Sequence, residues 1–207
     1  MTENDKYKKS PEPYLYYSMC MVAIWEKNEE EPLDEDEEPE FPKPYKDAMK
    51  FAAKARKKDK SGELSSENQD FYERLKEIGR KEAHWYIDEG NWKKAASQYK
   101  LVWKTDPDDA HFRFMLGTCE AISRNPGAAR VSINESVASL KEDYSDEQFE
   151  ASKESIPVLE EAMILYTDWL VENQSLPDSA KTLIGHAKMW LPDSEDIATQ
   201  AAKLGAN

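Results

Sequence analysis

Residues of matched size recur 34 positions apart in the middle of the chain. A recurring spacing of this length indicates that one supersecondary unit is built more than once. A single unit of this size cannot bury its own apolar face, so stacked neighbours must form the core together. The spacing therefore predicts an array of similar units. The matched pairs are Ala83 and Gly117, Ala95 and Ala129, and Tyr99 and Ile133.

The segments that carry this spacing have the periodicity of helices, and strand-like alternation is nearly absent. We expect helices over residues 65–89, 92–105 and 109–123. Ser66 is the predicted N-cap of the first helix, and Gln69, three residues later, is its expected capping-box partner. The fold class that follows is all-α.

Glycine and proline separate the predicted helices. Gly90 is expected to end the first helix. Pro107 is expected to end the second, because proline disfavours the helical conformation in the preceding residue, Asp106. Residues 125–127, Asn-Pro-Gly, are expected to form the turn after the third helix. Each unit is therefore a pair of helices, A and B, joined by a turn.

A 34-residue unit of two helices resembles the tetratricopeptide repeat family, most clearly over residues 76–143. In the register of that family, Gly90 makes the turn between helices A and B, and Ala95 lies where the two helices cross. Two positions depart from the family pattern. Glu82 stands where the family usually has a large apolar residue, and Lys141 stands where it often has proline.

Weaker copies of the unit flank these residues, so the resemblance covers nearly the whole chain and predicts a single domain over 1–207. The extra residues beyond the 34-residue repeat length lie in 144–160, and they are expected to add a short helix and a proline break. An acidic insertion, 29–42, is expected in the turn between the first two helices. The predicted repeats are 11–60, 66–109, 110–143 and 144–194, followed by a terminal helix over 195–205.

The resemblance implies an α-solenoid, a right-handed superhelix of antiparallel helix pairs with about three to four repeats, some of them irregular. Proteins of the family mostly bind peptides or partner proteins on a concave wall built from the A helices. The same register implies the groove residues of this chain. They are Leu15, Tyr16 and Met19; Arg80, Lys81 and His84; Phe114, Met115 and Thr118; and Leu165, Tyr166 and Trp169.

The charge of the chain is acidic, with a formal net charge of −14. The stretch from Glu29 to Glu40 contains nine acidic residues in twelve and no basic residue. We interpret it as a solvated loop, and the alternative is a decoy surface for a basic partner. Binding to nucleic acid or to an anionic membrane is not expected, because both need clustered lysine and arginine.

The residue patterns do not predict catalysis, a metal site or a cofactor. The glycines are scattered rather than gathered in a phosphate-binding loop. His84, His111 and His186 lack the spacing of a metal-binding helix, and each is expected on the surface or in the groove. Cys20 and Cys119 have no local spacing that indicates a disulfide framework or a zinc site. We therefore expect that the protein is not an enzyme.

The predicted function is that of a scaffold or adaptor that binds a peptide or protein segment in the concave groove. Two alternatives remain: a secretion or assembly chaperone that shelters an apolar segment, and a structural piece of a larger repeat-protein complex. The sequence does not identify the partner, and a homo-oligomer or larger assembly is left open. No run of 18 apolar residues predicts a membrane span. The expected location is the cytoplasm, or the periplasm or exterior if a signal segment has been removed.

Overall fold

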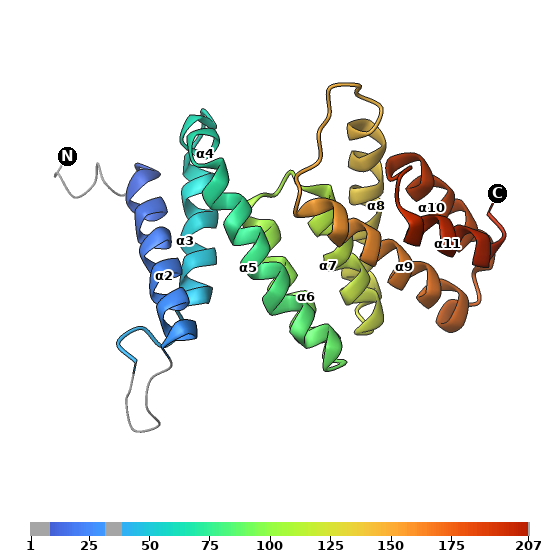
Figure 1. The fold of residues 1–207 in the computed structure, drawn as a ribbon, viewed down its shortest axis with the longest axis horizontal. Helices are drawn as coiled ribbons and strands as arrows, with labels where there is room; N and C mark the ends of the chain where they lie inside the picture. The colour runs from blue at the N-terminus through green and yellow to red at the C-terminus, as the bar shows by residue number, and fades with distance from the viewer. Residues whose placement is uncertain (1–8, 32–38, 207) are drawn as a thin grey trace. The chain divides into compact units, whose positions relative to one another are not determined.

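Helices are the only regular secondary structure in the described part of the chain. A computed structural model describes residues 9–31 and 39–206, and it places ten helices and no strand in these two ranges (Figure 1). Most of the acidic stretch, 32–38, lies outside the described residues. The prediction of an all-α fold is confirmed. None of the described helices combines the length and the apolar character that a membrane span requires.

The residues group into two compact units, and each is described by itself. Two helices, α5 (Gln69–Asp88) and α6 (Trp92–Thr105), contribute residues to both units. That the whole chain forms one domain stays a prediction. Unit 1 consists of Met1–Leu75 and Leu101–Asp106, and unit 2 consists of Lys76–Lys100 and Pro107–Asn207.

The first two helices of unit 1 pack side by side as an antiparallel pair (Figure 1). Tyr17 of the first helix contacts Phe51 of the second, with ring centroids 4.3 Å apart. Trp25, two turns later, lies 6.5 Å from Tyr45, which comes earlier in the second helix. The order of contacts therefore reverses between the two helices. The helices of unit 1 before α5 are α2 (Glu12–Glu30), α3 (Pro44–Lys58) and α4 (Glu63–Glu67).

The predicted long helix over 65–89 is two helices, and the prediction that Ser66 is its N-cap is wrong. Ser66 lies inside α4, where its N–H donates a helical hydrogen bond of 2.9 Å to the carbonyl of Gly62. The break comes at Asn68, whose side-chain amide donates to the carbonyl of Leu64 at 2.8 Å. This bond occupies a carbonyl at the end of α4, and Gln69 becomes the first residue of α5.

The helix ends predicted around Gly90 and Asp109 are confirmed. Gly90 has a φ of +67°, a left-handed conformation that glycine adopts without a Cβ penalty, and α5 ends two residues before it. The second predicted helix coincides with α6. The third is α7 (Ala110–Ile122), and the Asp109 side chain caps its first turn.

The prediction of a turn at residues 125–127 is wrong, because Pro126 is the first residue of α8 (Pro126–Asp143). Proline suits this position because the first helical N–H has no partner within the helix. The chain reverses just before it, at Arg124, whose φ is +64°.

The short helix expected within 144–160 is also absent, since residues 144–154, all of them described, form turns and irregular structure. Pro157 does not break a helix there. It lies in the first turn of α9 (Ser155–Gln174), where a missing N–H leaves no hydrogen bond unmade. The two helices after α9 are α10 (Pro177–Trp190) and α11 (Glu195–Leu204), and α11 confirms the predicted terminal helix.

Helices α7 and α8 cross closely in unit 2 (Figure 1). A Cβ atom placed on Gly117 would lie 2.9 Å from the side chain of Ile133, closer than real Cβ contacts allow. Gly117 therefore sets the separation of the two helices. Ala95 and Ala129, the small residues that the repeat spacing placed at crossings, are both buried, as predicted.

Helix α9 runs parallel to α11 (Figure 1). The Ser194 hydroxyl, at the N-cap of α11, donates to Glu160 near the start of α9. One to two turns later, the side chain of Gln200 donates to the Asp168 carboxylate at 2.7 Å. Contacts therefore advance in the same direction along both helices. Helix α7 is the central helix of this unit, because eleven of its 13 residues are buried.

Candidate interaction surface

The predicted groove residues of α7 lie in the core. Phe114, Met115 and Thr118 are fully buried. Helix α9 covers them: the Thr118 hydroxyl lies 3.5 Å from the Ala162 carbonyl, and the ring of Phe114 meets Tyr166 edge-on at 5.8 Å. These three side chains are part of the packing of unit 2 and present no open surface to a partner.

Two of the three predicted groove residues of α5, Arg80 and His84, contact carboxylates of α9 or its N-cap, whereas Lys81 pairs with Glu77 within α5. Arg80 forms an ion pair with Glu154, with nitrogen and oxygen 3.3 Å apart. One turn later the Nδ1 atom of His84 lies 3.2 Å from a carboxylate oxygen of Glu161. Burial raises the pKa of Glu161, although His84 and Arg80 favour its charged form. Because the two contacts advance in the same direction along both helices, α5 and α9 run parallel.

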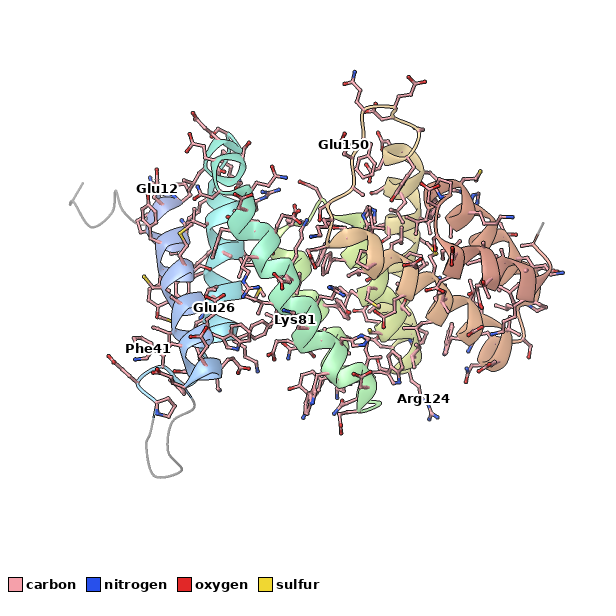
Figure 2. All side chains as sticks on the ribbon, viewed as in Figure 1. Glu12, Glu26, Phe41, Lys81, Arg124 and Glu150 are labelled. Carbon is pink, nitrogen blue, oxygen red and sulfur yellow. The ribbon has the colours of Figure 1, made fainter. Side chains whose placement is uncertain are left out.

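Beside the His84–Glu161 contact, both helices carry side chains that are not fully buried. On α5 these are Lys81, labelled in Figure 2, His84 and Trp85, all of them exposed. On α9 they are Leu165 and Trp169, both half-buried and on the turns that follow Glu161. We call these five residues the α5–α9 face.

Trp85 is the residue of this face that the sequence analysis missed. Its side chain is 58% exposed, and its ring meets Tyr86 edge-on at 4.7 Å. The family register assigns no groove role to position 85. On α9, Trp169 stacks on Tyr166 at 5.5 Å, and burial raises the pKa of Tyr166. The face therefore combines one exposed and one half-buried tryptophan.

The predicted groove residues of α2 separate into different environments in unit 1. Leu15 is fully buried, Met19 is half-buried, and Tyr16 is 59% exposed. Of these three, Tyr16 is the side chain that a partner can reach most readily.

Unit 2 also contains a buried charged cluster around Asp109, which no sequence pattern indicated. The Asp109 side chain is 6% exposed and lies 2.8 Å from the Lys76 ammonium. It accepts hydrogen bonds from the backbone N–H groups of His111 and Phe112 and, at 2.6 Å, from the Ser155 hydroxyl. Burial alone would raise the pKa of Asp109, but the hydrogen bond to His111 and the Lys76 charge hold it well below its usual range.

His111 belongs to this cluster, so the expectation that it lies on the surface or in the groove is wrong. It is buried, with Nδ1 3.3 Å from Asp109 and Nε2 3.0 Å from the Tyr144 hydroxyl. Burial, together with the nearby Asp109 charge, raises the pKa of Tyr144 to about 12. His84 is exposed and His186 is half-buried.

The cluster connects three helices of unit 2. The Ser155 hydroxyl donates to the Asp109 carboxylate. Lys76, Asp109 and Ser155 come from the three helices α5, α7 and α9 or their caps. Their contacts tie the three helices together at one end.

The two cysteines are in different environments. Cys20 is exposed on α2, and Cys119 is buried in α7, where burial raises the pKa of its thiol. In the part of the chain that the structure describes, no group of three or more histidine, cysteine, aspartate or glutamate side chains is placed to hold a metal ion.

In comparisons with known proteins, no family model, no curated protein and no solved structure matches this chain.

Proposed function

We propose that this chain is a protein-interaction scaffold of the tetratricopeptide type that binds a segment of a partner protein on the α5–α9 face. The parallel course of helices α5, α9 and α11 supports an array of this kind, as do the buried small residues at the 34-residue spacing. The contact surface is placed on α5 and α9 because the α7 residues of the predicted groove are occupied by the core.

The exposure of Trp85 carries this proposal. A tryptophan that is 58% exposed leaves a large apolar surface in water, and tryptophan is among the residues that most often dominate binding energy at protein interfaces. Lys81 lies one turn before it on the same helix face, and Glu77 pairs with Lys81 at 2.8 Å. An apolar anchor with a charged rim is the usual composition of a protein-binding surface.

The test replaces Trp85 with alanine. The matched control is Met189→Ala on α10, because Met189 is 66% exposed and is also in unit 2. Both variants should unfold at the wild-type temperature, since neither side chain contributes a buried contact. Proteins captured from a lysate by the wild-type chain should be lost with Trp85→Ala and retained with Met189→Ala. Direct titration of a captured partner should then show at least about tenfold weaker binding by Trp85→Ala.

Equal capture and equal affinity for the two folded variants would refute the proposed face. A variant of Trp169 provides a second reading from the other helix. Trp169→Ala should lower the affinity for the same partner. Because Trp169 is half-buried, the stability of this variant must be measured as well.

A further inference from the structure

A second surface, in unit 1, begins with an uncharged face of α2. No charged residue occurs from residue 13 to residue 25. Within this stretch Tyr16, Tyr17 and Cys20 are exposed. Cys20 neighbours both tyrosines on the helix surface, because it follows Tyr16 by four residues and Tyr17 by three. The face is therefore apolar and aromatic while remaining open to solvent.

The adjoining helix α3 carries a row of exposed lysines. Lys46, Lys50, Lys54 and Lys57 follow one another at spacings of four, four and three residues, which places them on one helix face. Within the described residues none of these four lysines forms a salt bridge. Helix α3 has six basic residues and one acidic residue, although the chain as a whole has a net charge of −14. The row is thus a concentrated positive patch on an acidic protein.

Aromatic rings connect the lysine row to the uncharged face. Phe51 of α3 contacts Tyr17 of α2 at 4.3 Å between ring centroids. The Lys54 ammonium lies 5.0 Å from the centroid of the Tyr14 ring and 5.5 Å from that of Phe51. The Lys50 ammonium also lies 5.5 Å from the Phe51 centroid. Cation–π contacts of this length hold the ammonium groups beside the rings without neutralising them.

We propose that this α2–α3 surface, comprising Tyr16, Tyr17, Phe51, Lys50 and Lys54, binds an acidic amphipathic helix of a partner protein. The partner's carboxylates meet the lysine row, and its apolar side chains cover the tyrosines and the phenylalanine. From Lys46 to Lys57 the row extends about 17 Å along α3, which matches about three turns of a bound helix. The site requires nothing from the α5–α9 face and is independent of the function proposed for it.

Charge complementarity favours a short acidic segment over a long polyanion. Phosphate backbones and anionic membranes extend far beyond the lysine row and would face the remaining negative charge of the chain. A helix of three turns stays within reach of the lysines, and the Debye length of about 8 Å at physiological salt screens it from distant carboxylates.

The experiment uses the full chain and a synthetic 14-residue helical peptide that has leucine and phenylalanine on one face and glutamate on the other. The Lys50→Glu/Lys54→Glu variant should bind this peptide with an affinity about tenfold or more below that of the wild type. The matched control is Lys100→Glu/Lys188→Glu, which makes the same charge change at two exposed lysines outside α3. This control, and Trp85→Ala, should bind the peptide like the wild type.

Cys20 provides a second readout on the surface itself. Cys20 is exposed and Cys119 is fully buried, so a thiol reagent should modify Cys20 selectively in the folded chain. Saturating acidic peptide should slow this modification several-fold. Tyr16→Ala should lower the affinity for the peptide. It should not lower the stability of the protein, because Tyr16 is largely exposed.

Three results would overturn the proposal. The first is equal binding by the wild type and Lys50→Glu/Lys54→Glu. The second is equal affinity for a peptide in which lysine replaces every glutamate. The third is tighter binding to a single-stranded oligonucleotide or to vesicles with anionic lipid than to the acidic peptide, which would assign the lysines to nucleic acid or to a membrane surface.

Discussion

Replacing Asp109 with alanine should destabilise the protein more than any comparable change of a charged residue on its surface. The carboxylate has two structural roles at once. It caps the N-terminus of α7 by accepting from two backbone N–H groups, and it pairs with the buried ammonium of Lys76 at 2.8 Å. It also accepts the Ser155 hydrogen bond at 2.6 Å. Alanine removes all of these interactions.

The expected magnitude follows from the burial of the pair. Lys76 is 4% exposed and the Asp109 side chain 6%, so neither charge is well solvated. Removing one partner of a buried ion pair typically costs about 3–5 kcal/mol. Loss of an N-cap costs about 0.5–2 kcal/mol, and this overlaps with the first figure because the same oxygens are involved. We expect a loss of about 3–5 kcal/mol, against a total stability of about 5–15 kcal/mol.

Urea unfolding followed by far-UV circular dichroism at pH 7 measures this loss. Asp108→Ala is the matched control, because Asp108 is adjacent and exposed and should change the stability by less than about 0.5 kcal/mol. Asp109→Asn separates the two roles, since the amide oxygen can still cap α7 while the charge is gone. Its stability should fall between that of Asp109→Ala and the wild type. Equal stability of Asp109→Ala and Asp108→Ala would refute the structural role of the cluster.

The same residue predicts a dependence on pH. The folded-state pKa of Asp109 is below the value in an unfolded chain, which is about 3.9. Below that value the unfolded state takes up the proton first, so acid favours unfolding. The contribution of Asp109 should therefore be complete above pH 5 and decline as the pH falls through 4. Asp109→Asn should lack this part of the acid dependence, and identical acid profiles for it and the wild type would contradict the assignment.

Two further predictions concern the small residues at helix crossings. Ala95→Leu should lower the stability by roughly 1–3 kcal/mol, because it overpacks a fully buried position. Ser97→Leu, at an exposed position of the same helix, should be nearly neutral. Equal melting temperatures of the two variants would show that Ala95 is not at a tight crossing. Gly117→Ala should destabilise by about 1–3 kcal/mol because its Cβ would meet Ile133, while Gly127→Ala, with no atom within 4 Å, should be neutral or stabilising by up to about 1 kcal/mol. Similar unfolding midpoints for the two glycine variants would contradict the close approach of α7 and α8.

Several features of the fold were predictable from the sequence because they depend on local chemistry. Helix α6 has the predicted bounds, since Gly90 permits the left-handed turn before it and Pro107 disfavours the helical conformation in the residue after it. The burial of Ala95 and Ala129 follows from the 34-residue spacing, because only small side chains allow two helices to cross closely. The acidic net charge also follows directly from the composition, but a net charge for the whole chain does not reveal the local lysine row of α3.

Tertiary packing decided which aromatic side chains of the predicted A helices remain exposed. In sequence, Phe114 and Trp85 are both aromatic residues on A-type helices. The structure buries Phe114 beneath α9 and leaves Trp85 largely exposed. Periodicity identifies a helix face, but it does not show how closely the next helices approach that face.

Tertiary packing also assembled the cluster around Asp109. Lys76, Asp109 and Ser155 are separated by 33 and 46 residues, and each taken alone resembles an ordinary surface or capping residue. Local propensity acts over a few residues, whereas this cluster exists only after α5, α7 and α9 have packed together. The sequence by itself determined the helices and their small crossing residues. The approach of helices distant in the chain determined which side chains are buried, which are charged in the interior, and which remain exposed.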